Sequence, residues 1–507
     1  MNANSKIRWS LLAAALLLVL AATILSVSQA VRAASGVPLP TVIGPIPVTD
    51  TSYPFMDRMG PPREAAQKAG YVEEEFFVSG MANVYQWDAN GNAVVRTPNA
   101  PYTTRIIVRR PGNLHKFSGT VWVEPLNPTL AIDLDRMWQL HYEQILRDGD
   151  AYVGITAKPI AIVALQNFDP VRYGSLSMAN PLPPDQQTCG RLPGEPGYSP
   201  NTSKLYENGL IWDIISQVGA ALKSSESPIG APAMRAYGEG WSQTGGYSVR
   251  YFNTFGPMAL MGDGSRVYDG WLIGGATGAT AINQCAAPVP ATDPRSQFLP
   301  HGVPVIWLRT QGDFFSFAYR RADSDAPGDQ FRLWELAGPT HDSITIFQNF
   351  APDADIIKAG VTPPNPAVCN YQYITDLPYE YNFNAAAQAL KAWVVDGIAP
   401  PHADRMVYDP SGNNVLDQYG NALGGVRTPY LDVPIWTYHM GAGPVFTCLV
   451  LGYKTPLSPD VIQQLYPQHG TYVSQVAQDT QRIVKEGFIP SYDASNIITQ
   501  AAQAAVP

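Results

Sequence analysis

A glycine-rich stretch at residues 240–246, which runs Gly-Trp-Ser-Gln-Thr-Gly-Gly, holds the best candidate for a nucleophile. It lies between a predicted strand at 233–237 and a predicted helix. A nucleophilic serine needs its hydroxyl lifted clear of the sheet on a strained turn, with small neighbours that let the helix approach the strand. Ser242 meets this requirement. Thr244 replaces the second glycine of the strict G-x-S-x-G pattern, so the alternative is an ordinary glycine-rich turn.

Such a serine requires a base and an orienting acid, in the chain order Ser, Asp/Glu, His. His341 fits the base because it follows a predicted strand at 331–336 through a short turn. Asp313 fits the acid because it follows a predicted strand at 303–308. Both residues lie just past the carboxyl ends of strands, where open parallel sheets place their sites. The alternatives are Asp342 and Glu335 for the acid, and His301 and His402 for the base.

An acyl-transfer site also needs two backbone N–H groups aimed at the oxyanion. We expect one from Gln243, the residue after the candidate nucleophile. We expect the other from the loop that follows a predicted strand at 120–123. Two prolines in this loop have no N–H group, which leaves Leu126 or Asn127 as the donor, and we favour Asn127.

Alternating strands and helices are expected to position these residues. Strands are predicted at 103–109, 120–123, 151–155, 233–237, 271–273, 303–308 and 331–336, and helices at 135–147, 210–222, 385–395, 459–464 and 473–486. The first two strands are expected to be neighbours. The pattern predicts an α/β fold: a mostly parallel, doubly wound sheet with helices on both faces, inserted loops at 158–206 and 277–300 that form pocket walls, and a C-terminal helical extension.

Three parts of the chain are distinguished. Residues 1–33 resemble a signal peptide, with Lys6 and Arg8 before an apolar stretch at 11–27 that is shorter than the roughly 20 residues of a membrane span. An uncleaved anchor helix is the alternative. Residues 34–100 are rich in proline and are predicted to be an irregular N-terminal segment. Residues 101–507 are predicted to form one domain that includes the C-terminal extension, because no Gly/Ser linker interrupts it.

The composition narrows the class of protein. A formal net charge of −9 and the lack of a Lys/Arg-dense block argue against nucleic-acid binding. A mean hydropathy of −0.09 excludes a protein with many membrane spans. The four cysteines, Cys189, Cys285, Cys369 and Cys448, show no CxxC pair and hence no metal-binding signal. In an exported protein they allow three disulfide pairings, among which the sequence does not choose, and buried free thiols are the alternative.

Several stretches resemble the α/β-hydrolase superfamily and, more narrowly, a family of predicted hydrolases known as the alpha/beta hydrolase domain family. They are residues 119–127, 169–174, 240–245, 334–341, 393–401 and 420–429. The resemblance covers roughly residues 100–500 and implies the α/β-hydrolase fold, a Ser-Asp-His hydrolase and no cofactor. In this family Thr244 is ordinary, which supports Ser242. Pro125 departs from the family pattern, where a bulky residue is expected, and this affects the identity of the oxyanion donor.

These observations predict a secreted or periplasmic serine hydrolase that cleaves a small-molecule or lipid-like carboxylic ester through an acyl-enzyme. The alternatives are an acyltransferase with the same triad and a catalytically weak, hydrolase-like binding protein. No nucleic-acid partner, no metal and no stable membrane insertion after signal cleavage are expected, and the oligomeric state is not predicted. Four aromatic residues either line an apolar pocket or pack in the core: Trp138, Trp241, Phe314 and Phe315.

Overall fold

The computed structural model describes residues 36–56, 60–276, 278–290, 292–313, 320–348 and 350–506. The predicted signal peptide at 1–33 and the aromatic pair at 314–315 lie outside these ranges. Within them, no helix combines the length and the apolar character needed to span a membrane.

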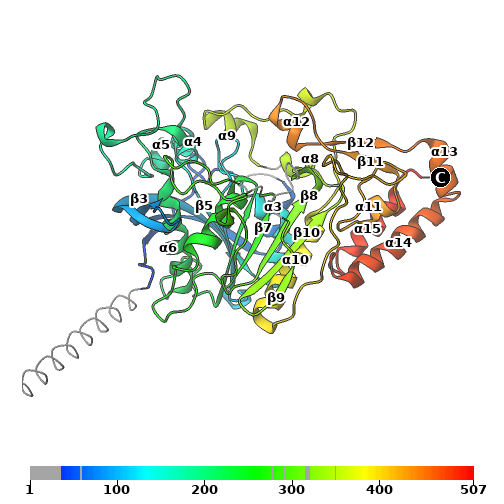
Figure 1. Cartoon of the computed structure of the whole chain (residues 1–507), viewed down its shortest axis with the longest axis horizontal. Helices are drawn as coiled ribbons and strands as arrows, with labels where there is room; N and C mark the ends of the chain where they lie inside the picture. The colour runs from blue at the N-terminus through cyan, green and yellow to red at the C-terminus, as the bar shows by residue number, and fades with distance from the viewer. Residues whose placement is uncertain are drawn as a thin grey trace, which may run out of the picture.

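A ten-stranded sheet runs through the middle of the described structure (Figure 1). Its strands are β1 (Thr41–Ile43), β2 (Tyr71–Trp87), β3 (Ala93–Pro111), β4 (Thr120–Pro125), β5 (Ala151–Ile155), β6 (Arg235–Trp241), β7 (Gly270–Gly274), β8 (Val305–Thr310), β9 (Ser324–Ala326) and β10 (Asp329–Leu336). The spatial order is β1-β2-β3-β5-β4-β6-β7-β8-β10-β9. The run from β5 to β10 is parallel, and β1, β2, β3 and β9 pair antiparallel at the two edges.

The predicted strands are all present, but one predicted neighbour relationship is wrong. The strands predicted at 103–109 and 120–123 are β3 and β4, and β5 lies between them. β5 pairs with Ile106–Arg109 on one side and with β4 on the other. The segment 112–119 is long enough to cross the roughly 10 Å that one intervening strand occupies, so a short connection does not force pairing.

Residues 34–100 are not irregular throughout, which corrects the sequence prediction. They contain α2 (Pro61–Lys68), and β2 and β3 form a long antiparallel hairpin that joins the main sheet. β3 pairs with β2 along one edge, but only residues 106–109 pair with β5 along the other edge. The prolines of β3 lie outside 106–109, where no backbone N–H is needed for pairing with β5. The proline content was therefore misleading, and β1 to β3 belong to the same sheet as the rest of the domain.

Helices cover both faces of the sheet. α3 (Arg136–Asp148) and α10 (Glu380–Asp396) pack on each other, and Lys391 of α10 forms an ion pair with Asp148 of α3. α6 (Ile211–Lys223) and α7 (Gln243–Arg250) also lie together, with the Trp212 and Tyr247 rings 5.5 Å apart. The shorter helices are α4 (Pro159–Phe168), α5 (Pro170–Tyr173), α8 (Ile344–Phe347), α9 (Asp353–Lys358), α11 (Pro429–Asp432) and α12 (Phe446–Val450).

The C-terminal extension is helical, as predicted. α13 (Pro459–Leu465), α14 (His469–Glu486) and α15 (Ala494–Gln503) lie together at one end of the molecule, drawn in red in Figure 1. A small antiparallel sheet of β11 (Trp436–His439) and β12 (Tyr453–Pro456) lies beside them. These elements contribute Val476, Ile483 and Ile497 to the main hydrophobic core, so the extension packs on the same domain.

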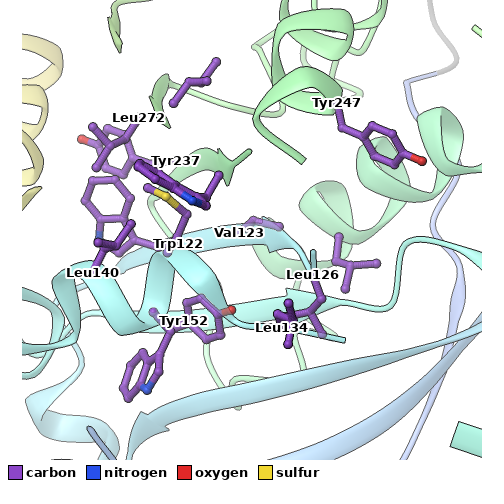
Figure 2. Close-up of a cluster of buried hydrophobic side chains, with 14 of the residues drawn as sticks. Trp122, Val123, Leu126, Leu134, Leu140, Tyr152, Tyr237, Tyr247 and Leu272 are labelled. Carbon is purple, nitrogen blue, oxygen red and sulfur yellow. The ribbon is translucent and has the colours of Figure 1, made fainter. Parts of the chain in front are cut away.

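Large buried aromatic side chains fix the two strands that matter most for the site. Trp122 of β4 stacks on Tyr237 of β6 with ring centroids 4.8 Å apart, and Figure 2 shows the pair close to Leu140 of α3. The indole N–H of Trp122 donates to Asp150 over 2.9 Å, so its polar atom is satisfied. β4 and β6 are thereby held in register, and both end at the same edge of the sheet.

Candidate active site

Ser242 lies on a sharp turn between β6 and α7. Its backbone has φ 57° and ψ −117°, a left-handed conformation that costs energy in a residue with a side chain. A Cβ on Gly240 would lie 2.4 Å from the Thr244 carbonyl oxygen, and one on Gly245 would lie 2.5 Å from the Gly274 carbonyl oxygen. Only glycine fits at these two positions, which is the close strand–helix approach that a lifted serine requires.

Thr244 has its own reason to replace glycine in this turn. Its side chain is fully buried, and its hydroxyl donates to the carbonyl oxygen of Trp241 over 3.1 Å. That bond satisfies the last carbonyl of β6. The departure from the strict motif therefore leaves the strand-to-helix turn intact.

The structure brings Asp313 and His341 together. Asp313 follows β8 in a short 3-10 turn, is fully buried, and accepts the backbone N–H of Thr310 over 2.8 Å through Oδ2. Its Oδ1 is hydrogen-bonded to Nδ1 of His341, in the loop after β10. A carboxylate can only accept, so Nδ1 carries the hydrogen and Nε2 is left with a free lone pair.

The loop that carries His341 is held from several sides. The Tyr379 hydroxyl donates to the His341 carbonyl oxygen over 3.1 Å. The backbone N–H of Asp342 donates to Val450 over 2.9 Å, and the Asp342 carboxylate pairs with Arg136. These contacts come from α3, from the residue before α10 and from the end of α12, so distant parts of the chain fix the imidazole.

The rival acids and bases are engaged elsewhere. Glu335 is fully buried and pairs with Arg320. Asp342 pairs with Arg136, as described above. The exposed His402 lies 3.0 Å from Asp323, and His301 packs against the ring of Phe252 at 5.6 Å. The geometry thus favours Asp313 and His341 over each alternative.

Ser242, Asp313 and His341 line one cavity of about 600 Å³. One wall comes from the inserted loop, through Ala279 and Val289, as predicted for 277–300. Another part of the lining comes from α12, through three apolar residues: Phe446, Leu449 and Val450. None of the described residues of the other predicted wall, 158–206, lines this cavity, so that expectation was wrong.

α12 is a part of the site that the sequence analysis missed. Phe446 and Leu449 are 49% and 37% exposed, which is unusual for large apolar side chains beside a cavity. The available signal was the run Val445 to Val450, an apolar stretch around Cys448. It was not used because nothing in the sequence ties this segment to residues 200 positions earlier.

Two disulfides fasten the cavity walls. Cys189 pairs with Cys285, between Ala279 and Val289 in the inserted loop. Cys369 pairs with Cys448 of α12. Each bridge joins residues whose Cα atoms lie 5.4 Å apart, and no cysteine of the described chain is free. The pairing left open by the sequence is thereby decided, and the bridges restrain the walls of the cavity.

Of the two predicted oxyanion donors, Gln243 stays a prediction, and the backbone N–H of Asn127 is corrected by the structure. Gln243 opens α7, where the first N–H groups of a helix have no partner within the helix. Asn127 lies beside Ser242, but its backbone N–H donates to Leu134 over 2.8 Å, and that of Leu126 donates to Ile155 over 2.8 Å. Neither N–H is available to an oxyanion, because the loop folds back on itself and on β5.

A buried polar cluster supports the strand that ends at Ser242. His141, at a kink in α3, lies 2.7 Å from Glu239 of β6, and Glu124 of β4 accepts the Tyr152 hydroxyl over 2.6 Å. Burial raises the pKa of both glutamates well above the usual range and lowers the pKa of His141 to about 3. The cluster therefore joins β4, β6 and α3 through buried polar contacts.

The described residues contain no group of three or more His, Cys, Asp or Glu side chains arranged to hold a metal ion. The groups that converge on the cavity are instead a hydroxyl, an imidazole and a carboxylate. A hydroxyl beside an imidazole with a free lone pair is suited to nucleophilic attack on an acyl carbon.

The fold and the site together define an α/β hydrolase: a mostly parallel sheet with a serine on a strained strand-to-helix turn and a His–Asp pair at the same edge. The family model described as "Alpha/beta hydrolase domain" matches residues 42–499, and the chain belongs to this family. The match begins well before residue 101, in keeping with the place of β1 to β3 in the main sheet. No curated protein matches the sequence significantly.

Solved structures similar to this one include several esterases. A fungal esterase from Rhizomucor miehei aligns with a TM-score of 0.32 and 12% identity, over 66% of this chain and 89% of the other. Esterase Est22 aligns with a TM-score of 0.27 and 11% identity, over 49% of this chain and 66% of its own. A putative dienelactone hydrolase from Klebsiella pneumoniae aligns with a TM-score of 0.26 and 11% identity, over 56% of this chain and 95% of the other. The chain thus spans about two thirds of Est22.

Proposed function

We propose that this protein is a serine hydrolase that cleaves carboxylic esters, with Ser242 as nucleophile, His341 as general base and acid, and Asp313 as the orienting carboxylate. The observation that carries the proposal is the hydrogen bond between Asp313 and His341 at a cavity that Ser242 enters from a strained turn. This bond orients the imidazole so that its unprotonated Nε2 is the nitrogen available to the serine.

In the first half of the reaction, Ser242 Oγ attacks the ester carbonyl carbon while Nε2 of His341 takes the hydroxyl proton. The buried Asp313 stabilises the imidazolium that forms, since its carboxylate lies away from water. Collapse of the tetrahedral intermediate breaks the bond to the alkoxy oxygen. Nε2 returns the proton to that oxygen, so the alcohol leaves and an acyl-serine remains.

In the second half, a water molecule takes the place of the alcohol. His341 removes its proton as the water oxygen attacks the acyl carbon, and the carboxylic acid is released when the proton returns to Ser242 Oγ. Only one ester bond is broken and one water is consumed. An alcohol acceptor in place of water would give acyl transfer with the same residues.

The oxyanion of both intermediates would be held by the N–H of Gln243 at the start of α7. A helix N-terminus favours negative charge, which adds to the hydrogen bond. A second donor has to come from further along the loop after β4 than Asn127. The backbone N–H of Thr129 donates to the Asn127 side chain over 2.9 Å, which leaves that of Leu130, a residue that lines a small cavity beside Ser242. Removal of one such donor costs about 10²–10³ in kcat in other acyl-transfer sites.

The substrate is proposed to carry an apolar group. Phe446, Leu449 and Val450 of α12 face the cavity together with Val289 of the inserted loop. Burial of one methylene on such a surface stabilises binding by about 0.8 kcal/mol. We therefore expect affinity to increase with the length of an acyl or alkyl chain until the cavity of about 600 Å³ is filled.

Secretion is part of the proposal. Two disulfides join cysteines that are 96 and 79 residues apart in the sequence. Disulfides of this kind persist in oxidising compartments, and the sequence at 1–33 has the pattern of a signal peptide.

The test is hydrolysis of p-nitrophenyl esters from acetate to palmitate by the mature protein, beside Ser242→Ala and a surface control, Ser474→Ala. Turnover that is lost in Ser242→Ala and kept in Ser474→Ala, with folding unchanged by circular dichroism, supports the proposal. Labelling of the wild type by a fluorophosphonate, and its loss in Ser242→Ala, gives an independent readout. Equal activity in Ser242→Ala and Ser474→Ala would contradict the proposed function.

A further inference from the structure

A second, much smaller cavity adjoins Ser242 and His341. It measures about 20 Å³ and lies between the loop after β4 and the residues around the nucleophile. Its lining includes Trp241 and the side chain of Arg136, from the first turn of α3. A cavity of this size holds about one water molecule or one oxygen-bearing group of a ligand.

Arg136 presents an unused hydrogen-bond donor at this cavity. Its side chain is fully buried, with 2% of the residue exposed. One guanidinium nitrogen, Nη2, pairs with Asp342, but Nη1 has no hydrogen-bond partner among the described residues. The indole Nε1 of Trp241, which lines the same cavity, is also buried without a partner. Buried unpaired donors cost about 1–3 kcal/mol each, so they favour an oxygen acceptor in this place.

The charge around the guanidinium points to an uncharged acceptor. The Asp342 carboxylate already neutralises the charge of Arg136. The hydroxyl of Tyr379, the residue before α10, also interacts with the guanidinium. The guanidinium also lies over the rings of Phe350 and Trp241, with its carbon 5.3 and 5.8 Å from their centroids. A further carboxylate would therefore be buried beside these rings without a charge partner of its own.

We propose that Arg136 determines acyl specificity by donating a hydrogen bond from Nη1 to a neutral oxygen, a hydroxyl or a carbonyl, carried on the acyl group next to the scissile carbonyl. The inference rests on the proposed function, since it places this oxygen relative to an acyl group bound at Ser242. The small volume limits the substituent to one oxygen and its hydrogens. The large cavity then receives the apolar remainder of the substrate.

The test compares two esters of the same shape, phenyl lactate and phenyl isobutyrate, which differ by a hydroxyl in place of a methyl. The wild type is expected to prefer phenyl lactate by about tenfold or more in kcat/KM, the size expected of one hydrogen bond to a charged donor. Arg136→Lys keeps a charge beside Asp342 but lacks the forked guanidinium. In this variant kcat/KM for phenyl lactate is expected to fall to the value for phenyl isobutyrate, while kcat/KM for phenyl isobutyrate stays the same.

Arg147→Lys, the same substitution at an exposed position of α3, is the control and should keep the preference. Should Arg136→Lys fold poorly, the double variant Arg136→Met with Asp342→Asn removes both charges together. No preference in the wild type, or an equal loss on both esters, would overturn the inference, the latter because it indicates an oxyanion or structural role. Failure of the proposed function looks different: neither ester is turned over and Ser242 is not labelled by a fluorophosphonate.

Discussion

Nδ1 of His341 donates a hydrogen bond to Oδ1 of Asp313, although 28 residues separate them and they follow different strands. β8 and β10 are parallel neighbours, so the loops at their carboxyl ends leave the sheet side by side. A Cβ on Gly312 would lie 2.6 Å from the backbone nitrogen of His341, which shows how closely the two loops pack. The pair is therefore a product of strand order, and it defines which nitrogen of the imidazole can serve a nucleophile.

Asp313→Asn tests that relationship directly. The amide keeps the size of the side chain but presents an N–H to the imidazole, which favours the wrong tautomer. We expect kcat to fall by about 10³–10⁴, as in a well-known serine protease with the same change, with little effect on KM. Steady-state kinetics with p-nitrophenyl butyrate would measure kcat and KM of the variant and the wild type. A fall of less than tenfold would remove Asp313 from its proposed role.

Gly275→Ala should disable the site without replacing a proposed catalytic residue. Gly275 has φ +60°, and a Cβ there would lie 2.9 Å from the Trp241 ring and 3.1 Å from Cε1 of His341. The expected outcome is a loss of turnover of at least tenfold and a lower unfolding midpoint, because either the backbone or the imidazole has to move. Gly262→Ala is the matched control, since a Cβ there meets nothing within 4 Å. Similar effects in both variants would contradict the prediction.

Removal of the Cys369–Cys448 bridge should act mainly on substrate binding. This bridge anchors α12, which supplies Phe446 and Leu449 to the large cavity. Cys369→Ser with Cys448→Ser is expected to raise KM for octanoate esters severalfold while kcat for acetate changes little. Loss of the closed loop also lowers stability by about 2–4 kcal/mol.

The informative comparison for that experiment is Phe446→Ala, which removes the apolar side chain but keeps the bridge. If α12 forms the binding wall, this variant reproduces the change in KM for long esters without the loss of stability. An unchanged ratio of octanoate to acetate KM in both variants would show that α12 does not contact the substrate.

Two buried carboxyls, Asp493 and Glu380, are expected to contribute stability that decreases as the pH rises from about 4 to about 7. Burial raises the pKa of Asp493 to about 7 and that of Glu380 to about 7, above their usual values near 4. Each folded-state carboxyl therefore holds its proton more tightly than the unfolded chain does. The contribution to stability is complete below the unfolded pKa and is lost as the pH passes through the folded pKa.

Asp493→Asn isolates one of these contributions. Asp493 is fully buried and accepts the Asn384 side-chain amide over 3.0 Å. The wild type should lose on the order of 2 kcal/mol more than the variant between pH 5 and pH 8, from urea unfolding at both values. Parallel losses in the two proteins would show that Asp493 is ionised in the folded state at pH 5.

The strands, the helices and the loops that carry the chemistry are predictable from local features of the sequence. Strands rich in β-branched residues, glycines around Ser242 and the order Ser, Asp, His are local or ordered features, and each was visible without coordinates. The hairpin of β2 and β3 was partly missed because its prolines resemble those of an irregular segment. β3 tolerates them because most of one of its edges does not pair with β5.

Which distant groups meet depends instead on how the folded chain packs. The pairing of Arg136 with Asp342 spans 206 positions, and α12 reaches the cavity from the far end of the chain. The cysteine pairing, and the use of the Asn127 N–H by Leu134 rather than by an oxyanion, depend in the same way on the path of loops. Such contacts follow from packing and strand order, and they leave no periodic or local signal in the sequence because each partner is chosen by the fold rather than by its neighbours along the chain.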